Sequence, residues 1–138
     1  MIEGDKETSG SKDMIINTEW GAFGNQGELD FILTKWDKRV DAASVNPGKQ
    51  IFEKMISGMY MGEVARQVLV DLVEENLIFV GKDTSLLIKH GRFYTKYVSE
   101  IESDPVGVFK LCRDALADIG IEKVSDEGKY LFDTMLAM

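Results

Sequence analysis

The chain has 138 residues, of which 44% are hydrophobic and 29% are charged, as is typical of one soluble globular domain. Its formal net charge is −8, and its 16 lysines and arginines are scattered rather than clustered, which argues against a nucleic-acid-binding protein. The most apolar windows, residues 67–73 and 77–80, are too short to span a bilayer, so we expect no membrane segment. The single cysteine, Cys112, excludes an internal disulfide and favours a cytoplasmic setting.

The N-terminal part is predicted to hold a strand, a glycine-rich loop and a short helix. Residues 1–13 are polar and rich in glycine and serine. We expect a turn there, or the bend of a hairpin whose first strand is missing if the chain belongs to a longer protein. Residues 14–20 open with three apolar residues and predict a β-strand, and glycines follow it. Residues 29–40 alternate charged and apolar groups, as a short amphipathic helix does.

The strongest helical pattern begins at Asn46 and Pro47. Asparagine is a favourable N-cap, and proline suits the first position of a helix. Apolar pairs recur at helical spacing from there to Glu75, and one helix of that length would measure about 43 Å. Ser57 and Gly58 interrupt the run, so we expect two consecutive helices that meet near Gly58.

Shorter helices are predicted in the C-terminal half. Residues 83–90 and 93–102 contain capping residues, and residues 104–118 begin with Asp-Pro and carry one apolar face that includes Cys112. The last predicted helix, residues 125–138, is still apolar where the sequence stops, which indicates a truncated element.

Few side chains in this sequence suit catalysis or metal binding. His90 is the only histidine, which excludes a histidine-based triad or a multi-histidine metal site within these residues. Its simpler interpretation is a helix-terminal residue before Gly91. Cys112 lies on an apolar helical face, which favours a packed thiol over a nucleophile. No Walker-type loop or dinucleotide fingerprint is present, and we assign no metal ligand.

Two carboxylates occupy positions that suit a ligand with several hydroxyl groups. Glu19 lies where the predicted strand gives way to a loop, and Glu53 follows Gln50 by three residues, so these two share a helical face. Ionised carboxylates accept strong hydrogen bonds from hydroxyls. A site built for hydroxyls also rejects analogues that lack them. The alternative is that Glu53 is a solvated helix residue paired with Lys49 or Lys54.

The sequence resembles the eukaryotic hexokinase and glucokinase family in three stretches, which occur in the family's order and at about its spacing. The stretches are M-I-I-N-T-E-W-G-A-F-G, N-P-G-K-Q-I-F-E-K-M-I-S-G-M-Y-M-G-E and G-R-F-Y-T-K-Y-V-S-E-I-E-S-D. The resemblance implies an actin-like, ribonuclease-H-like α/β fold with a small and a large domain. Residues 1–138 would then form part of the large domain, predominantly helical with an N-terminal strand or hairpin, and the small domain would lie elsewhere.

The same resemblance implies an activity and the residues that serve it. The family phosphorylates glucose and other hexoses at the 6-hydroxyl, with ATP and Mg²⁺. Its motifs imply glucose contacts from Glu19, Gln50 and Glu53. They imply nucleotide contacts from Gly58, Met59, Thr95, Lys96 and Ser99, of which Thr95 is the strongest candidate.

The resemblance also implies that much of the machinery lies outside these residues. In the family, the general base is an aspartate that lies upstream of the matched segment. Two phosphate-binding loops and further sugar contacts lie upstream as well. The adenosine-binding glycine segment lies downstream. We therefore expect no catalytic residue here and a pocket completed by the remainder of the hexokinase chain. The alternative is a non-catalytic helical interaction module, suggested by the apolar stripe on residues 125–138.

Overall fold

The structure is a computed structural model, and it describes residues 15–125. This part of the chain is helical and contains no β-strand. Its elements, in chain order, are a 3₁₀ turn η1 (Trp20–Ala22) and the helices α1 (Lys35–Ala43), α2 (Ile51–Ile56), α3 (Gly58–Glu74), α4 (Ser85–Ile88), α5 (Thr95–Glu102) and α6 (Lys110–Asp118).

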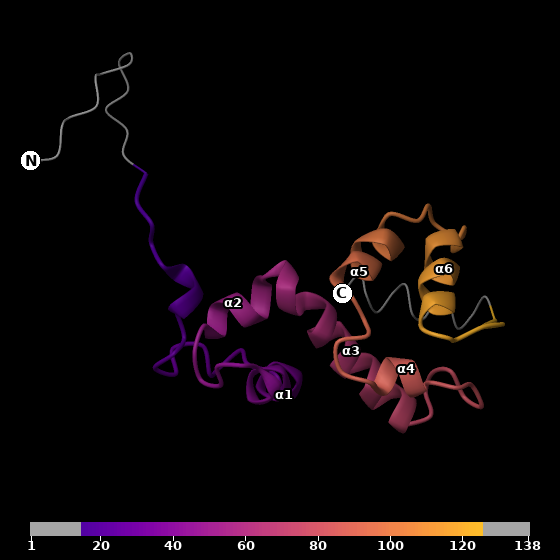
Figure 1. The fold of residues 1–138 in the computed structure, drawn as a ribbon, viewed down its shortest axis with the longest axis horizontal. Coiled ribbons are helices and arrows are strands. Elements are labelled where there is room, and N and C mark those ends of the chain that lie inside the picture. Colours follow the sequence, from indigo (N-terminus) through magenta and orange to yellow (C-terminus); the bar gives the residue numbers. More distant parts are fainter. Residues whose placement is uncertain (1–14, 126–138) are drawn as a thin grey trace, which may run out of the picture.

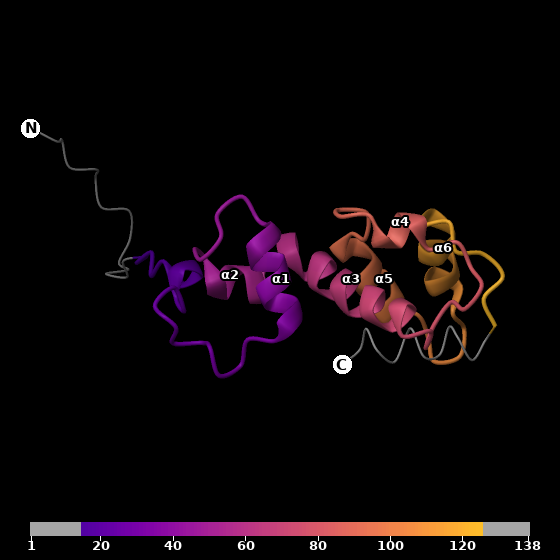
Figure 2. The same ribbon diagram turned by 90° about the horizontal axis from the view of Figure 1, so that it is seen from below.

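Helix α3 is the longest element and connects the two ends of the described molecule. Figure 1 shows η1, α1 and α2 at one end and α4 and α6 at the other, with α5 alongside α3. The perpendicular view in Figure 2 gives the same order along the long axis. The N-terminal and C-terminal groups of helices are therefore joined through α3.

The hydrophobic core lies in the C-terminal group of helices. Leu69 of α3, Leu87 of α4, Ile101 of α5 and Leu116 of α6 are fully buried against one another. Cys112 of α6 is buried in the same core, which confirms its prediction as a packed thiol. Since α1 and α2 contribute nothing to this cluster, other interactions must attach them to α3.

The predicted break between two consecutive helices near Gly58 is confirmed. Ser57 has extended backbone angles (φ −77°, ψ 144°) and is both the C-cap of α2 and the N-cap of α3. Its N–H donates to the carbonyl of Glu53 at 2.8 Å, and its hydroxyl accepts the N–H of Met59 at 3.2 Å. One serine thus satisfies backbone groups at the ends of both helices.

The β-strand predicted over residues 14–20 is wrong for the residues that the structure describes. Residues 15–19 have no regular secondary structure and are exposed, and residues 20–22 form η1. An extended segment becomes a strand only when a neighbouring strand takes up its backbone hydrogen bonds. Residues 15–125 supply no such neighbour. The hairpin bend predicted for residues 1–13 lies outside the described residues, as does the body of the helix predicted for residues 125–138.

Three helices begin four to six residues later than the sequence predicted, and α4 and α5 begin two residues later. The helix expected over residues 29–40 begins at Lys35, because Thr34 forms a capping box with Asp37. The Thr34 hydroxyl accepts the N–H of Asp37 at 3.2 Å, and the Asp37 carboxylate accepts the N–H of Thr34 at 2.8 Å. These reciprocal bonds start the helix after several residues of turn.

Left-handed residues delay the other two helices. The helix expected from Pro47 begins at Ile51, after Gln50 with φ 52°. The helix expected from residue 104 begins at Lys110, after Phe109 with φ 51°. A residue with positive φ cannot continue a right-handed helix, so these two positions set the first turns.

A charged cluster holds α1 against α3. Asp71 of α3 is only 7% exposed. Its carboxylate accepts the indole N–H of Trp36 at 2.9 Å, pairs with Lys35 at 2.5 Å and bonds to the guanidinium of Arg39. The hydrogen bonds from Lys35 and then Arg39 lower the pKa of Asp71 to about 2. This carboxylate is therefore ionised at neutral pH and joins three side chains of α1.

The close approach of α3 and α5 depends on Gly62. A Cβ atom added there would overlap the backbone nitrogen of Thr95 and lie 2.7 Å from the carbonyl carbon of Tyr94. The N–H of Gly62 donates to the hydroxyl of Thr95 at 2.8 Å. The obstacle is backbone, which cannot rotate away as a flexible side chain would.

We predict that Asp71→Asn lowers the free energy of unfolding at neutral pH by about 1–3 kcal/mol, because its donors lose an ionised acceptor. The folded-state pKa lies below the unfolded value, so the contribution of the charge is complete above about pH 4. It is lost as the pH falls through about 2. Urea denaturation of both proteins near neutral pH and near pH 2 should show the difference shrinking. An equal difference at both values would contradict a role for the charge.

We predict that Gly62→Ala lowers the free energy of unfolding by about 1–3 kcal/mol, because the new methyl group forces the backbones of α3 and α5 apart. The matched control is Gly58→Ala, at a helical position where an added Cβ meets nothing within 4 Å. That control should leave stability unchanged or raise it by up to about 1 kcal/mol. Thermal unfolding monitored by circular dichroism compares the two, and similar losses in both would rule out the close approach as the cause.

Candidate functional site

Gln50 and Glu53 form a polar pair beneath the backbone of η1. The Gln50 amide Nε2 donates to the Glu53 carboxylate Oε2 at 3.1 Å. A Cβ atom added to Gly21 would lie 3.1 Å from that Nε2 and 3.2 Å from that Oε2. The backbone at Gly21 thus lies directly against both groups. The alternative pairing of Glu53 with Lys54 is not found, because the Lys54 ammonium lies 2.7 Å from Asp41 instead.

The segment after η1 caps the first turn of α2 and so fixes this contact. The N–H of Phe52 donates to the carbonyl of Phe23 at 3.1 Å, and the N–H of Ile51 donates to the Asn25 side chain at 3.3 Å. The ring of Trp20 packs on that of Phe52 with centroids 6.0 Å apart. Backbone donors at a helix start have no partner within the helix, and here residues of the preceding loop supply partners.

Glu19 lies two residues before Gly21 in the chain, but it is bonded differently from Gln50 and Glu53. Its carboxylate accepts the side-chain amide of Asn17 at 2.5 Å, and its N–H donates to the side-chain oxygen of Asn17 at 3.1 Å. Glu19 is exposed and has φ 49°. Gln50, with φ 52°, is left-handed as well. Such conformations cost about 1–3 kcal/mol each and are concentrated at functional sites.

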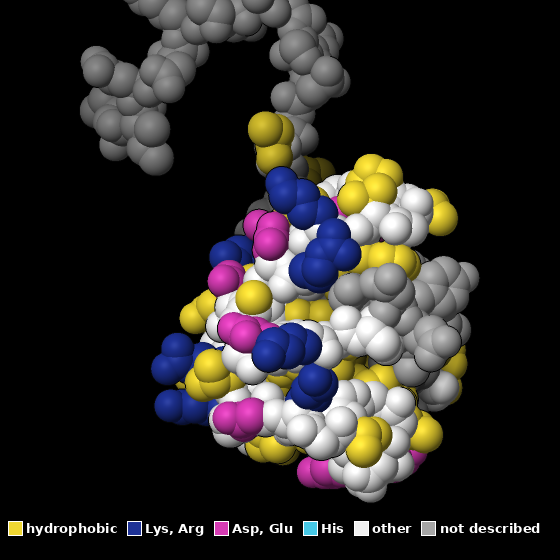
Figure 3. Space-filling model, turned by 90° about the vertical axis from the view of Figure 1, so that its right-hand side faces the viewer, with side chains coloured by type: hydrophobic (Ala, Val, Ile, Leu, Met, Phe, Trp, Pro, Cys, Tyr) yellow, Lys and Arg dark blue, Asp and Glu magenta, His cyan; other side chains and the backbone are white. Residues whose placement is uncertain are grey.

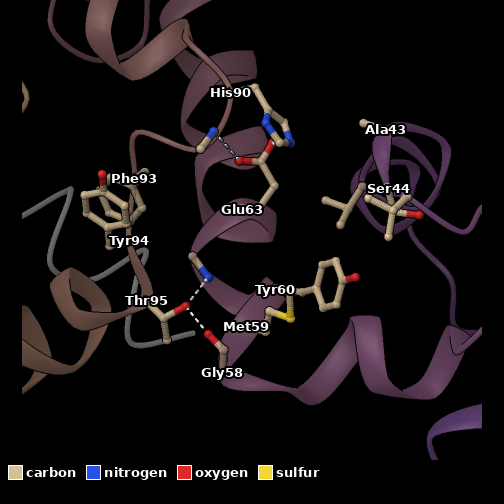
Figure 4. A pocket seen from close by; sticks show the side chains of 14 residues that line it. Ala43, Ser44, Gly58, Met59, Tyr60, Glu63, His90, Phe93, Tyr94 and Thr95 are labelled. Carbon is tan, nitrogen blue, oxygen red and sulfur yellow. Dashed lines mark hydrogen bonds and ion pairs between the residues drawn. The ribbon is translucent and has the colours of Figure 1, made fainter.

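A pocket of about 390 Å³ lies between the end of α1, the first half of α3 and residues 90–95 (Figure 4). Three of the predicted nucleotide-contacting residues line it: Gly58, Met59 and Thr95. The other two, Lys96 and Ser99, are exposed on α5 and do not line the pocket. The Lys96 ammonium lies 4.0 Å from Asp118 and 4.8 Å from the centre of the Tyr97 ring.

Thr95 fastens the start of α5 to the first turn of α3. Its hydroxyl donates to the carbonyl of Gly58 at 2.5 Å and accepts the N–H of Gly62 at 2.8 Å, as Figure 4 shows. The hydroxyl therefore has a structural function in addition to any contact with a ligand.

Glu63 and His90 also line this pocket, although neither was predicted from the sequence to be a site residue. The Glu63 carboxylate bonds to Arg66 at 2.6 and 2.8 Å and accepts the N–H of Gly91 at 3.4 Å. Burial acts to raise the pKa of Glu63, but the hydrogen bonds and charge of Arg66 outweigh it and lower that pKa. His90 lies 3.7 Å from Glu63, beyond the end of α4. The sequence signal that could have identified Glu63 was its i,i+3 spacing from Arg66, which favours an ion pair on one helical face.

The described part of the chain shows no metal centre of its own. Within residues 15–125, no three His, Cys, Asp or Glu side chains gather as metal ligands. No helix in the same range is long and apolar enough to cross a membrane. Figure 3 shows the end of the molecule at α4 and α6, where the coloured basic and acidic side chains are interspersed. That face carries no broad patch of one sign.

Comparison with known proteins identifies the family. The family model described as hexokinase matches residues 1–136. Hexokinase-2 of Homo sapiens is 46% identical over 127 residues, which cover 92% of this chain and 13% of that protein. Hexokinase-1 of Mus musculus is 46% identical over 127 residues, which cover 92% of this chain and 12% of that protein.

A solved structure extends this similarity to the fold. The hexokinase from Schistosoma mansoni, complexed with glucose, superimposes with a TM-score of 0.79 and 37% sequence identity. The match covers 87% of this chain and 27% of that one. The chain thus spans 12–13% of the length of the two mammalian relatives. Sequence, family model and fold agree, and the chain belongs to the hexokinase family.

Proposed function

We propose that this chain supplies part of the substrate sites of a hexokinase that phosphorylates glucose and other hexoses at the 6-hydroxyl with ATP. The observation that carries the proposal is the Gln50–Glu53 pair, held at 3.1 Å beneath a backbone that has no side chain at Gly21. Family membership gives the reaction class. Residues 1–138 would then be part of the large domain.

The sugar contacts follow from the chemistry of the pair. Glu53 accepts hydroxyl hydrogen bonds through its carboxylate. Gln50 both orients that carboxylate and offers an amide of its own. Glu19, two residues before Gly21, supplies a second carboxylate from the segment that packs on α2. Holding a hexose by several hydroxyls presents the reacting hydroxyl in one orientation, which is a large part of what phosphoryl transfer requires.

The nucleotide contacts are proposed at the pocket between α1, α3 and α5. Gly58, Met59 and Thr95 line it. The Thr95 hydroxyl would donate to a phosphate oxygen in place of the Gly58 carbonyl that accepts its proton in this structure. Lys96 and Ser99 follow Thr95 on α5 and would contact the nucleotide from the pocket's edge. ATP supplies the phosphoryl group, and Mg²⁺ neutralises charge on its phosphates when bound.

The remainder of a hexokinase chain is proposed to complete these sites. Transfer to a hydroxyl needs a general base, and the family resemblance assigns it to an aspartate outside these residues. Glu19 and Glu53 act as hydroxyl acceptors instead. The cytoplasmic location inferred from the single cysteine stays a prediction. The alternative of a non-catalytic interaction module depended on residues 125–138, and no observation in the described residues favours it.

We predict that Glu53→Ala and Glu19→Ala each raise the glucose KM about tenfold or more and lower kcat, because each removes a charged acceptor for sugar hydroxyls. The assay uses a chimera in which this chain replaces the matching segment of Schistosoma mansoni hexokinase. Glu28→Ala is the matched control, since Glu28 is an exposed carboxylate in the same N-terminal region. Unchanged glucose KM values in both site variants would refute the proposed sugar site.

We predict that the 138-residue chain alone forms no glucose 6-phosphate from glucose and ATP, because the base and the phosphate-binding loops lie elsewhere. Its glucose affinity should be about 1 mM or weaker, since only part of the hydroxyl contacts is available. A coupled enzymatic assay and isothermal titration calorimetry measure these two quantities. Turnover above the heat-inactivated control, or micromolar affinity, would show that the site is complete without further residues.

A further inference from the structure

A buried ion pair holds the loop that precedes Gln50. Lys54 of α2 is 3% exposed although it is charged. Its ammonium lies 2.7 Å from the Asp41 carboxylate of α1 and donates to the carbonyl of Asn46 at 2.8 Å. A buried charge persists only where it is paired and hydrogen-bonded. Lys54 therefore ties α2 both to α1 and to the middle of the loop that joins them.

Asp41 fastens the same loop at two further points. Both of its carboxylate oxygens lie 3.0 Å from the N–H of Gly48. Its backbone carbonyl accepts the N–H of Ser44 at 3.1 Å and the Ser44 hydroxyl at 2.6 Å. Asp41 and the Lys54 ammonium thus hold the connection from α1 to α2, residues 44–50, at Ser44, Asn46 and Gly48.

The loop ends at Gln50 in a conformation that needs support. A left-handed glutamine costs about 1–3 kcal/mol and is kept only where the surroundings determine it. The carbonyl of Gln50 accepts the N–H of Lys54 at 3.1 Å, so the two residues lie one turn apart. With the loop attached, the Gln50 amide stays on Glu53 beneath Gly21. A loosened loop would let Gln50 return to an ordinary conformation and carry its amide away.

We propose that Lys54 and Asp41 are positioning residues of the sugar site, which act through the backbone of residues 44–50 to set Gln50 against Glu53. The proposal rests on the proposed function of Gln50 and Glu53. Lys54 bonds to Asp41 and to the Asn46 carbonyl, and it serves the sugar by fixing the loop.

The first test measures the loop itself in the 138-residue chain. Lys54→Met keeps the length of the side chain but removes its charge, and amide hydrogen exchange should become at least about tenfold faster at Gly48. The amide of Gly62, on α3, should keep its rate. Lys49→Met is the matched control, since Lys49 is exposed in the same loop, and it should change neither rate. Unchanged exchange at Gly48 in Lys54→Met would overturn the proposal.

The second test separates positioning from general destabilisation, using the chimeric hexokinase described above. Lys54→Met should raise the glucose KM about tenfold and leave the ATP KM unchanged, as expected when one hydrogen bond to the sugar is misaligned. Leu116→Ala, in the remote core, is the control for lost stability. It should lower the amount of active enzyme without changing either KM. An equal change in both KM values, or a glucose KM no higher than that of Leu116→Ala, would overturn the proposal.

A variant that fails to fold does not end the test. Asp41→Asn is nearly identical in shape and weakens the same attachments. It should therefore show the same faster amide exchange at Gly48 and the same selective rise in glucose KM. If Glu53→Ala and Glu19→Ala both leave the glucose KM unchanged, the proposed sugar site is wrong, whereas the rate of amide exchange at Gly48 still decides whether the ion pair holds the loop. The two failures are therefore distinguishable.

Discussion

The contact between Gly62 and Thr95 is the constraint on which the rest of this structure depends. Helix α3 can meet the start of α5 backbone to backbone only because Gly62 has no side chain. The Thr95 hydroxyl then satisfies groups at two positions of α3 at once. This contact determines where α5 begins. It thereby sets the wall of the pocket on one side and the packing of Ile101 into the core on the other.

The two ends of the molecule differ in how their helices are joined, although Leu29, Val40 and Ile51 are buried apolar residues at the N-terminal end. The C-terminal helices share an apolar core, whereas α1 is joined to α3 through Asp71 and to α2 through Asp41 and Lys54. Ion pairs of this kind add little net stability compared with apolar packing, but they are directional. The candidate sugar residues lie at the end that is held by directional bonds, which suits a site that must present polar groups at defined positions.

Sequence patterns predicted the features that depend on neighbours along the chain. The break at Ser57–Gly58 and the burial of Cys112 follow from a local breaker residue and from helical periodicity. The three-residue spacing of Gln50 and Glu53 predicted their proximity, although Gln50 precedes the helix. The start of α2 could not be predicted this way, because it follows the left-handed Gln50. The loop before Gln50 is bonded by Asp41 and Lys54, which are 13 residues apart. The strand expected at residues 14–20 required a partner strand. The pairing of Lys96 with Asp118, which lies 22 residues further along the chain, likewise depends on how α5 and α6 pack.

Ser57 joins the helix that carries the candidate sugar residues to the helix that carries two of the candidate nucleotide residues. Helix α2, which ends at this serine, contains Glu53 and has Gln50 as its N-cap. Helix α3, which follows, begins with Gly58 and Met59. Ser57 is the only residue between the two helices, so a change in its two backbone torsions would turn α2 relative to α3. A rotation of about 10° there would move the far end of α2, about 9 Å away, by roughly 1.6 Å. Displacements of that size are enough to separate a well-aligned substrate from a poorly aligned one.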